Sequence, residues 1–152
     1  ILVNDLKPNA ELYAKYNAEH VDKETLYRES DVISVHVPLT RQTRHLIGTR
    51  EMAMMKPTVR LVNTARGGII HEGGLYEALV SNRVAGAAID VFEEEAYSGP
   101  RTQTENCFIS CHMGSMTQDC RAEMEIRATE EALRFVRGEP LANVVPEYEY
   151  EL

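Results

Sequence analysis

Three side chains stand out for the chemistry that their types allow. Arg66 closes the run Leu-Val-Asn-Thr-Ala-Arg over residues 61–66, Glu95 ends an acidic run, and His112 follows a short apolar segment. A guanidinium offers paired donors to a planar carboxylate, and an imidazole exchanges a proton with a hydroxyl group near neutral pH. A carboxylate beside that imidazole orients the ring and favours its charged form. Together they predict transfer of a proton and a hydride on a small 2-oxo or 2-hydroxy acid.

Ordinary structural interpretations compete with this one. A strand-end arginine is often a surface ion pair, and acidic runs such as residues 93–95 usually face solvent. Glu95 is singled out only by its position shortly after a predicted strand that ends near Asp90. His36 and His45 are interpreted as structural, and His71 as the residue that precedes a helix.

A metal site must be considered, because four potential ligands are close together in the sequence: Cys107, Cys111, His112 and Cys120. Their spacing matches no paired C-x-x-C zinc motif, so we expect no metal. We expect Cys107 and Cys111 to flank a buried strand as small apolar residues.

Composition narrows the class of protein. The formal charge is −8 over 152 residues, and no clustered basic face is found, so we expect no nucleic-acid partner. No apolar run is long enough to span a bilayer and no signal peptide precedes the first expected strand, so we expect no membrane association. Three cysteines, an odd number, fit a reducing compartment, and we expect a cytoplasmic location.

Strands and helices alternate along the chain. We expect strands over residues 1–3, 32–37, 59–63, 84–91 and 107–110, a short extended piece near residues 20–21, and helices over residues 10–16, 22–29, 48–55, 72–81 and 117–136. Apolar strands without strict alternation favour a parallel sheet covered on both faces. This predicts a doubly wound, Rossmann-like α/β fold, with Asp5, Pro38, Arg66, Asp90 and His112 at the carboxyl ends of strands.

The fold is expected to be incomplete. No G-x-G-x-x-G turn, the usual pyrophosphate-binding loop, occurs in the sequence. The first residues, Ile-Leu-Val, suit an internal start better than a native terminus. In the 3-2-1-4-5-6 strand order, the absent first strand would lie between the strand ending at Asp5 and the strand ending at Val37.

Three blocks resemble one enzyme family. They are residues 30–40, the Leu-Val-Asn-Thr-Ala-Arg-Gly-Gly block at residues 61–68, and residues 84–95. They resemble the D-isomer-specific 2-hydroxyacid dehydrogenases, the family of phosphoglycerate dehydrogenase and D-lactate dehydrogenase. The resemblance implies a nucleotide domain inserted in a substrate domain, usually in a homodimer. Residues 1–114 would be the C-terminal portion of the nucleotide domain, and residues 115–152 the helix and tail returning to the substrate domain.

The resemblance also implies roles for individual residues. Arg66 would bind the substrate carboxylate, Glu95 would be the acidic partner and His112 the acid/base. The cofactor would be NAD, because Asp5 would accept from the adenosine ribose hydroxyls and repel a 2′-phosphate. The remaining cofactor contacts would be made by Val37, Pro38, Thr64, Ala65, Asp90 and Gly114 as well as by Arg66 and His112.

Some positions depart from the family pattern. The family commonly has proline after the catalytic glutamate and before the histidine, where this chain has Ala96 and Cys111. The leading hypothesis is an NAD-dependent oxidoreductase for a small 2-hydroxy or 2-oxo acid, completed by a second copy or by a missing N-terminal segment. Alternatives are a relative that oxidises a small anion such as formate, a non-catalytic nucleotide-sensing or corepressor-like scaffold, and an inactive fragment.

Overall fold

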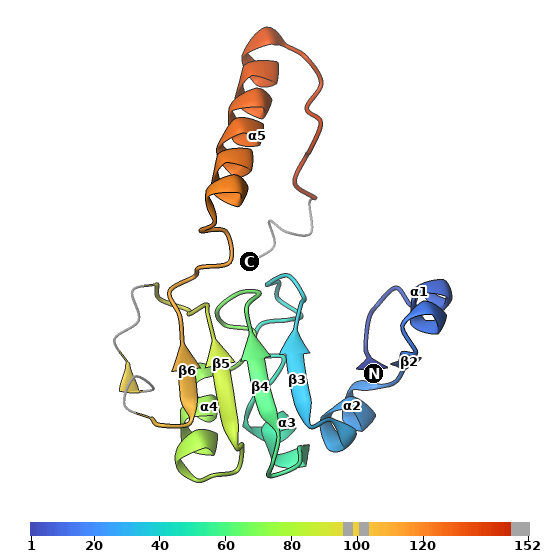
Figure 1. Ribbon diagram of the computed structural model, residues 1–152, viewed down its shortest axis with the longest axis vertical. Coiled ribbons are helices and arrows are strands. Elements are labelled where there is room, and N and C mark those ends of the chain that lie inside the picture. Colours follow the sequence, from blue (N-terminus) through green and yellow to red (C-terminus); the bar gives the residue numbers. More distant parts are fainter. Residues whose placement is uncertain (96–98, 101–103, 147–152) are drawn as a thin grey trace.

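The computed structural model of the protein describes residues 1–95, 99–100 and 104–146. Helices and strands alternate as expected (Figure 1). They are β1 (Leu2–Val3), α1 (Ala10–Lys15), β2 (Glu19–His20), α2 (Lys23–Glu29), β3 (Val32–Val35), α3 (Thr49–Met54), β4 (Arg60–Asn63), α4 (Glu72–Val80), β5 (Gly86–Ile89), β6 (Cys107–Ile109) and α5 (Gln118–Arg137). Each of the five predicted strands is one to four residues shorter in the structure than the apolar run that predicts it.

Side-chain caps fix where the helices begin. Asp22, the expected cap of α2, accepts a hydrogen bond from the backbone N–H of Thr25, and this bond lowers the pKa of the Asp22 carboxyl. Asn9 and Thr117 cap α1 and α5 in the same way. At the other end of α5, Gly138 adopts φ 68°, a left-handed conformation that glycine reaches without steric cost.

The strands form two parallel sheets. One pairs β1 with β2, and the other has the order β3-β4-β5-β6. Among the described residues, no ladder joins β1 to β3, so the break lies where the sequence predicts the absent first strand. The α/β class with a parallel, incomplete sheet is thus confirmed.

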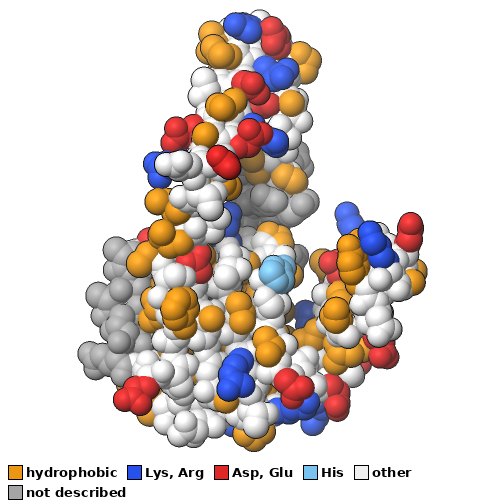
Figure 2. Space-filling model, viewed as in Figure 1, with side chains coloured by type: hydrophobic (Ala, Val, Ile, Leu, Met, Phe, Trp, Pro, Cys, Tyr) orange, Lys and Arg blue, Asp and Glu red, His pale blue; other side chains and the backbone are white. Residues whose placement is uncertain are grey.

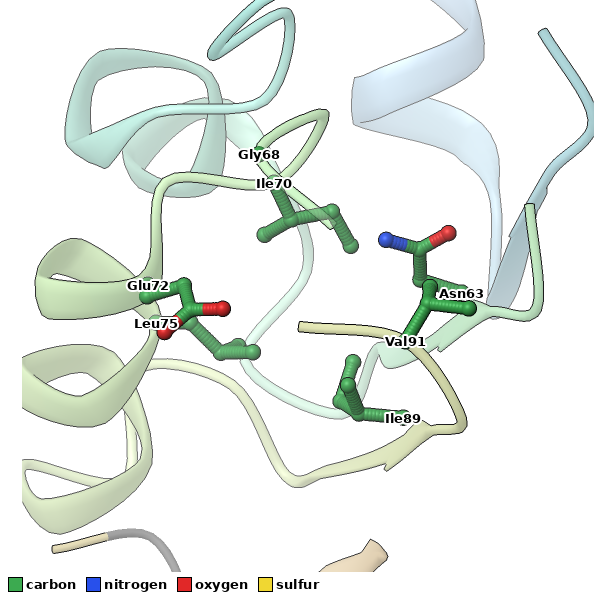
Figure 3. A pocket seen from close by; sticks show the side chains of 7 residues that line it. All are labelled: Asn63, Gly68, Ile70, Glu72, Leu75, Ile89 and Val91. Atoms are coloured by element: carbon green, nitrogen blue, oxygen red, sulfur yellow. The ribbon is translucent and has the colours of Figure 1, made fainter. Parts of the chain in front are cut away.

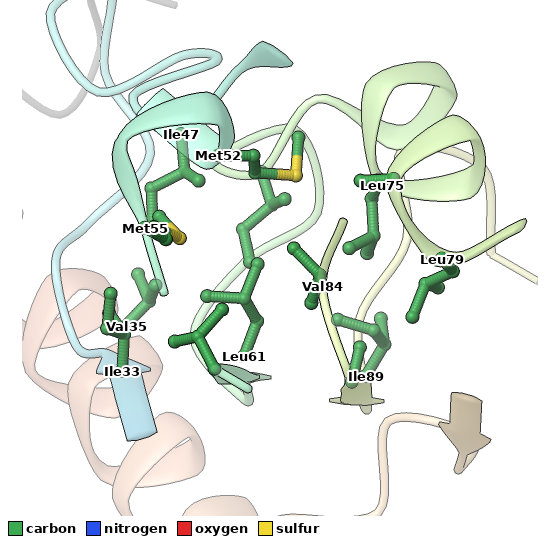
Figure 4. Packing of buried hydrophobic residues seen from close by; sticks show 14 of the residues in the cluster. Ile33, Val35, Ile47, Met52, Met55, Leu61, Leu75, Leu79, Val84 and Ile89 are labelled. Atoms are coloured by element: carbon green, nitrogen blue, oxygen red, sulfur yellow. The ribbon is translucent and has the colours of Figure 1, made fainter. Parts of the chain in front are cut away.

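The hydrophobic core lies between the four-stranded sheet and the helices behind it in Figure 1, where α3 packs against both α2 and α4. Met52 of α3 and Leu75 of α4 point toward Leu61 of β4 and Ile89 of β5 (Figure 4). All four side chains are at most 4% exposed. This core holds rigid the strands whose carboxyl ends carry the predicted site residues.

The opposite face of the sheet is open in the described part of the chain. Along β3, Ile33 and Val35 are buried whereas Val32 and Ser34 are exposed. The expectation of a sheet covered on both faces is therefore not met within these residues. Residues 107–110 do contain a strand, β6, but it is only partly buried. Cys107 and Ile109 pack against the core, whereas Phe108 is 71% exposed, because β6 lies at the edge of the sheet among the described residues.

Helix α5 extends away from the body of the molecule (Figure 1). None of its residues is buried, and apolar and charged side chains alternate over its surface (Figure 2). Its apolar residues include Met124, Leu133 and Phe135, each at least 45% exposed. In the described residues, neither this helix nor any other combines the length and apolar character needed to cross a membrane.

Candidate active site

The turn after β4 presents Arg66. Asn63, the last residue of that strand, is buried, and its side-chain amide donates to the carbonyl of Arg66 (2.9 Å) and accepts from the N–H of Ala65 (3.1 Å). A Cβ on Gly67 would lie 2.0 Å from the carbonyl carbon of Phe92, so only glycine fits there. The turn is therefore fixed from both sides, and the exposed Arg66 side chain starts from a defined backbone.

His112 is held by the end of β5. Its backbone has φ 52°, in the left-handed region that is unfavourable for residues other than glycine. The N–H of His112 donates to the carbonyl of Asp90 (2.8 Å), and the N–H of Met113 donates to both carboxylate oxygens of Asp90 (3.0 Å each). These bonds stabilise a strained conformation, a feature that often marks functional sites.

Asp90 itself is a buried carboxylate. Burial raises the pKa of Asp90, but hydrogen bonds from the Ser110 hydroxyl and from the backbone of Met113 and Gly114, together with His112, outweigh burial and leave the pKa below its ordinary value. Asp90 is therefore ionised at neutral pH. The structure gives its carboxylate a role in holding the residue 110–113 loop.

Glu95 and His112 meet as the sequence predicts. The Oε1 atom of Glu95 lies 3.1 Å from Nδ1 of His112, and the two side chains are 55% and 46% exposed. Because Nδ1 is engaged by a carboxylate, the ring orientation is fixed and Nε2 is the nitrogen that can exchange a proton with a substrate.

A surface cavity of about 210 Å³ brings the three predicted residues together. Its lining consists of Leu39, Arg44, Arg66, Gly67, Val91, Phe92, Glu93, Glu95 and His112. A guanidinium and a carboxylate–imidazole pair thus line one space of a size suited to a small acid. This arrangement can bind a carboxylate and deliver a proton beside it.

The predicted cofactor residues lie outside this cavity, except Arg66 and His112. Asp5 follows β1 and is exposed, with one carboxylate oxygen accepting from the N–H of Lys7 (2.7 Å). Val37 and Pro38 follow β3, and Thr64 and Ala65 follow β4. A Cβ on Gly114 would meet nothing within 4 Å, which leaves space for a ligand near that backbone.

The donor set therefore fits part of a dinucleotide. A carboxylate at Asp5 is a suitable acceptor for ribose hydroxyls, and the space at Gly114 suits a close backbone approach. The pyrophosphate has no matching loop in the sequence.

Two charged residues of the cavity were missed by sequence reasoning. Arg44 lies in the loop after β3 with no motif around it to mark it, and Glu93 was grouped with the solvated acidic run. Asn63 had a recognisable signal, because an asparagine at the end of a buried strand commonly closes a turn through its own side chain.

A second cavity lies among side chains of β4, β5 and α4 and of the segments that follow β4 and β5 (Figure 3). It encloses about 10 Å³ and is lined by Asn63, Gly68, Ile70, Glu72, Leu75, Ile89 and Val91. That volume holds a single water at most. This cavity is a packing void of the core and not a substrate site.

Two of the other histidines make local side-chain contacts. Nδ1 of His71 caps α4 by accepting from the N–H of Gly74 (3.0 Å), and Nε2 of His36 lies 2.8 Å from the hydroxyl of Ser34. Ala96 lies outside the described residues, whereas Cys111 is exposed. Within the described ranges, no group of three or more His, Cys, Asp or Glu side chains could hold a metal ion.

Several known proteins are similar to this chain in sequence and in fold. The model of the family described as D-isomer specific 2-hydroxyacid dehydrogenase, NAD binding domain, matches residues 1–114. The chain is 42% identical over 140 residues to a glyoxylate reductase of Thermococcus litoralis, covering 91% of this chain and 42% of that relative. It is 40% identical over 125 residues to a D-3-phosphoglycerate dehydrogenase of Methanocaldococcus jannaschii, covering 82% and 24%.

A solved structure agrees with these matches. The holo form of Rhodotorula graminis D-mandelate dehydrogenase superposes with a TM-score of 0.86 at 34% identity, covering 97% of this chain and 44% of that one. The chain therefore spans less than half the length of each of these relatives.

Proposed function

Because the chain belongs to the D-isomer-specific 2-hydroxyacid dehydrogenase family, we propose that it carries the catalytic residues of an enzyme that interconverts D-2-hydroxy acids and 2-oxo acids with NAD. The observation that carries the proposal is the cavity shared by Arg66, Glu95 and His112. The alternative of a formate-type relative is disfavoured by Glu95, where such relatives usually have glutamine.

The chain's own residues would act as follows in the direction of reduction. Arg66 binds the substrate carboxylate through two parallel N–H donors and so orients the C2 carbonyl. His112, oriented by Glu95 through Nδ1, gives the proton on Nε2 to the oxygen of C2 as the alkoxide develops. The hydride to C2 would be the contribution of a nicotinamide cofactor when one is bound. In oxidation, neutral His112 takes the hydroxyl proton back.

The substrate would be a small 2-oxo acid. A cavity of about 210 Å³ accommodates a carboxylate, a carbonyl and a short side chain. Two of the relatives are named for glyoxylate and phosphoglycerate, both small acids. The rest of the pocket would come from outside the described residues, either from a second copy in a homodimer or from another part of the polypeptide.

Residues 1–114 would serve as part of the nucleotide-binding domain, and residues 115–152 would lead back to a substrate domain. The family match ends at residue 114, just before α5, which supports this division. The exposed apolar residues of α5 support packing against another part of an assembly.

NAD is proposed over NADP because Asp5 would repel a 2′-phosphate. Replacing Asp5 with serine in the intact polypeptide is expected to narrow the preference for NADH over NADPH. The ratio of kcat/KM values for the two cofactors, measured before and after, tests this. If the ratio is the same before and after the substitution, Asp5 is not part of the cofactor site.

The test of the function itself is a turnover assay on the intact polypeptide, meaning these 152 residues together with any further part of the same chain. NADH oxidation is followed with a panel of 2-oxo acids that includes glyoxylate, pyruvate and hydroxypyruvate. We expect turnover with at least one of them. NADH binding without turnover on any acid would favour the nucleotide-sensing alternative.

A further inference from the structure

Two loops that line the cavity meet at Glu93. The loop over residues 36–48 contributes Leu39 and Arg44 to the lining, and the loop after β5 contributes Glu93 and Glu95. Oε1 of Glu93 lies 3.2 Å from Nε2 of His45, and Oε2 lies 3.8 Å from a guanidinium nitrogen of Arg44. Glu93 thus links two segments that are far apart in the sequence.

His45 is held in place independently of this contact. Its backbone has φ 53°, and its N–H donates to the carbonyl of Gly68 at 2.7 Å. Its ring packs against the ring of His71 with the two planes at 78° and the centroids 4.7 Å apart. The ring is therefore fixed to the turn that follows Arg66.

Glu93 is also fixed through its backbone. Its N–H donates to Oε1 of Glu72 at 2.8 Å. The peptide between Phe92 and Glu93 lies against Gly67, where a Cβ would come within 2.0 Å of the Phe92 carbonyl and 2.6 Å of the Glu93 nitrogen. Glu93 therefore lies where three segments meet: the turn after β4 that carries Arg66, the loop over residues 36–48, and the loop after β5.

We propose that the contact between His45 and Glu93 positions the residue 92–95 loop, so that Glu95 stays in contact with His112 in the cavity that Arg66 also lines. His45 and Glu93 are then positioning residues, since they act through Glu95 and touch no reacting atom. The inference rests on the proposed function, because it names what holds that site together.

A purely stabilising role explains the contact less well. The side chains of His45 and Glu93 are 40% and 35% exposed, and ion pairs in such positions contribute little to folding. The charged and titratable groups around them are Arg44, His71 and Glu72, all on the segments already described. What the contact does fix is the distance between two loops of one cavity.

The test uses the intact polypeptide and two variants that break the contact. Glu93→Ala removes the carboxylate, and His45→Asn removes the ring while keeping a residue that tolerates the left-handed backbone. We expect each variant to lower kcat by about three- to tenfold with a smaller change in the substrate KM. In the double variant, kcat is expected to be no lower than in the more affected single variant.

Two further variants separate positioning from general damage. Glu93→Gln keeps an oxygen that His45 can donate to and is expected to retain most of kcat. Glu24→Ala breaks the exposed Glu24–Arg28 ion pair of α2 (2.7 Å) and is the matched control, with kcat unchanged. An unchanged kcat in both contact-breaking variants, or losses that multiply in the double variant, would overturn the proposal.

A structural readout keeps the proposal separate from the proposed function. The backbone N–H of Glu93 donates a hydrogen bond to Glu72. Hydrogen exchange at this N–H is expected to be faster in His45→Asn than in the wild type, even if no 2-oxo acid is turned over. If the wild type lacks activity, the proposed function fails. If exchange at Glu93 also stays unchanged, the positioning proposal fails with it.

Discussion

At the scale of single residues, the site depends on side chains whose backbones are fixed by neighbours. Arg66 is presented by a turn that the buried Asn63 closes with two hydrogen bonds. His112 is held in a left-handed conformation by the carbonyl of Asp90. Functional groups that start from fixed backbones lose less freedom when a substrate binds, which is the physical basis of preorganised catalysis.

Arg66→Lys, made in the intact polypeptide, is expected to raise the substrate KM and lower kcat. Lysine keeps the positive charge, but a point charge cannot reproduce the two parallel donors of a guanidinium. Steady-state kinetics with the best 2-oxo acid, analysed as kcat and KM separately, provide the measurement. If catalytic efficiency stays at the wild-type level, Arg66 does not bind the substrate.

Sequence reasoning selected residues at this scale when a motif surrounded them. Arg66 was marked by its Asn-Thr-Ala-Arg-Gly-Gly context, and the structure brings it into one cavity with Glu95 and His112. Glu93 was passed over because its neighbours in sequence are also acidic. Its contact with His45 depends on the fold of a loop 48 residues away, which no local pattern encodes.

At the scale of elements, the parallel strands bring the site together. β4 and β5 pair in register, so Asn63 lies beside Ile89 and the residues that follow each strand meet at one edge. Asp90, directly after β5, then connects this edge to the loop after β6. Parallel α/β sheets generally collect functional residues at their carboxyl ends for this reason.

Asp90→Asn tests that connection through its pH dependence. The pKa of Asp90 is lower in the folded protein than its ordinary value of about 3.9, so its carboxylate contributes stability above about pH 4 that is lost as the pH falls through the lowered pKa. We expect the variant to unfold at lower denaturant concentration than the wild type at pH 7, and this difference to shrink toward pH 3.

The matched control for that variant is Asp31→Asn, which alters an exposed carboxylate paired with Lys56 (2.9 Å). Urea unfolding of both variants in the intact polypeptide at pH 7, 5 and 3 provides the comparison. A stability difference for Asp90→Asn that is the same at all three pH values would contradict the role of its charge.

Elements were predictable where local signals were strong. Caps such as Asp22 and the glycine at position 138 marked helix ends correctly. Burial was predicted less well, because an apolar segment such as residues 107–110 has the same composition at a sheet edge as in its centre. Which face of the sheet is covered depends on contacts between segments far apart in the sequence, and local sequence patterns do not specify these.

At the scale of the whole molecule, the sheet is divided. Among the described residues, β1 with β2 and β3 with its three partners form separate sheets, and the facing edges of β1 and β3 pair with nothing. An unpaired parallel edge is a template for another strand. We therefore expect the gap to be filled in the working protein, by another part of the polypeptide or by a strand from a second copy.

The 152-residue chain on its own is expected to bind NADH weakly, because it lacks both that strand and a phosphate-binding loop. Native mass spectrometry combined with an NADH fluorescence titration measures both properties. A monomeric 17.2 kDa species with tight NADH binding would contradict the expectation.

The central claim is that His112 exchanges the proton of a 2-oxo acid at a site it shares with Arg66 and Glu95. The most direct measurement is kcat of His112→Gln in the intact polypeptide, with NADH affinity determined on the same sample. We predict a fall in kcat of about 10²–10⁴-fold with NADH binding retained, because proton transfer is lost while the cofactor contacts remain. Wild-type turnover, or a parallel loss of NADH affinity, would contradict the claim.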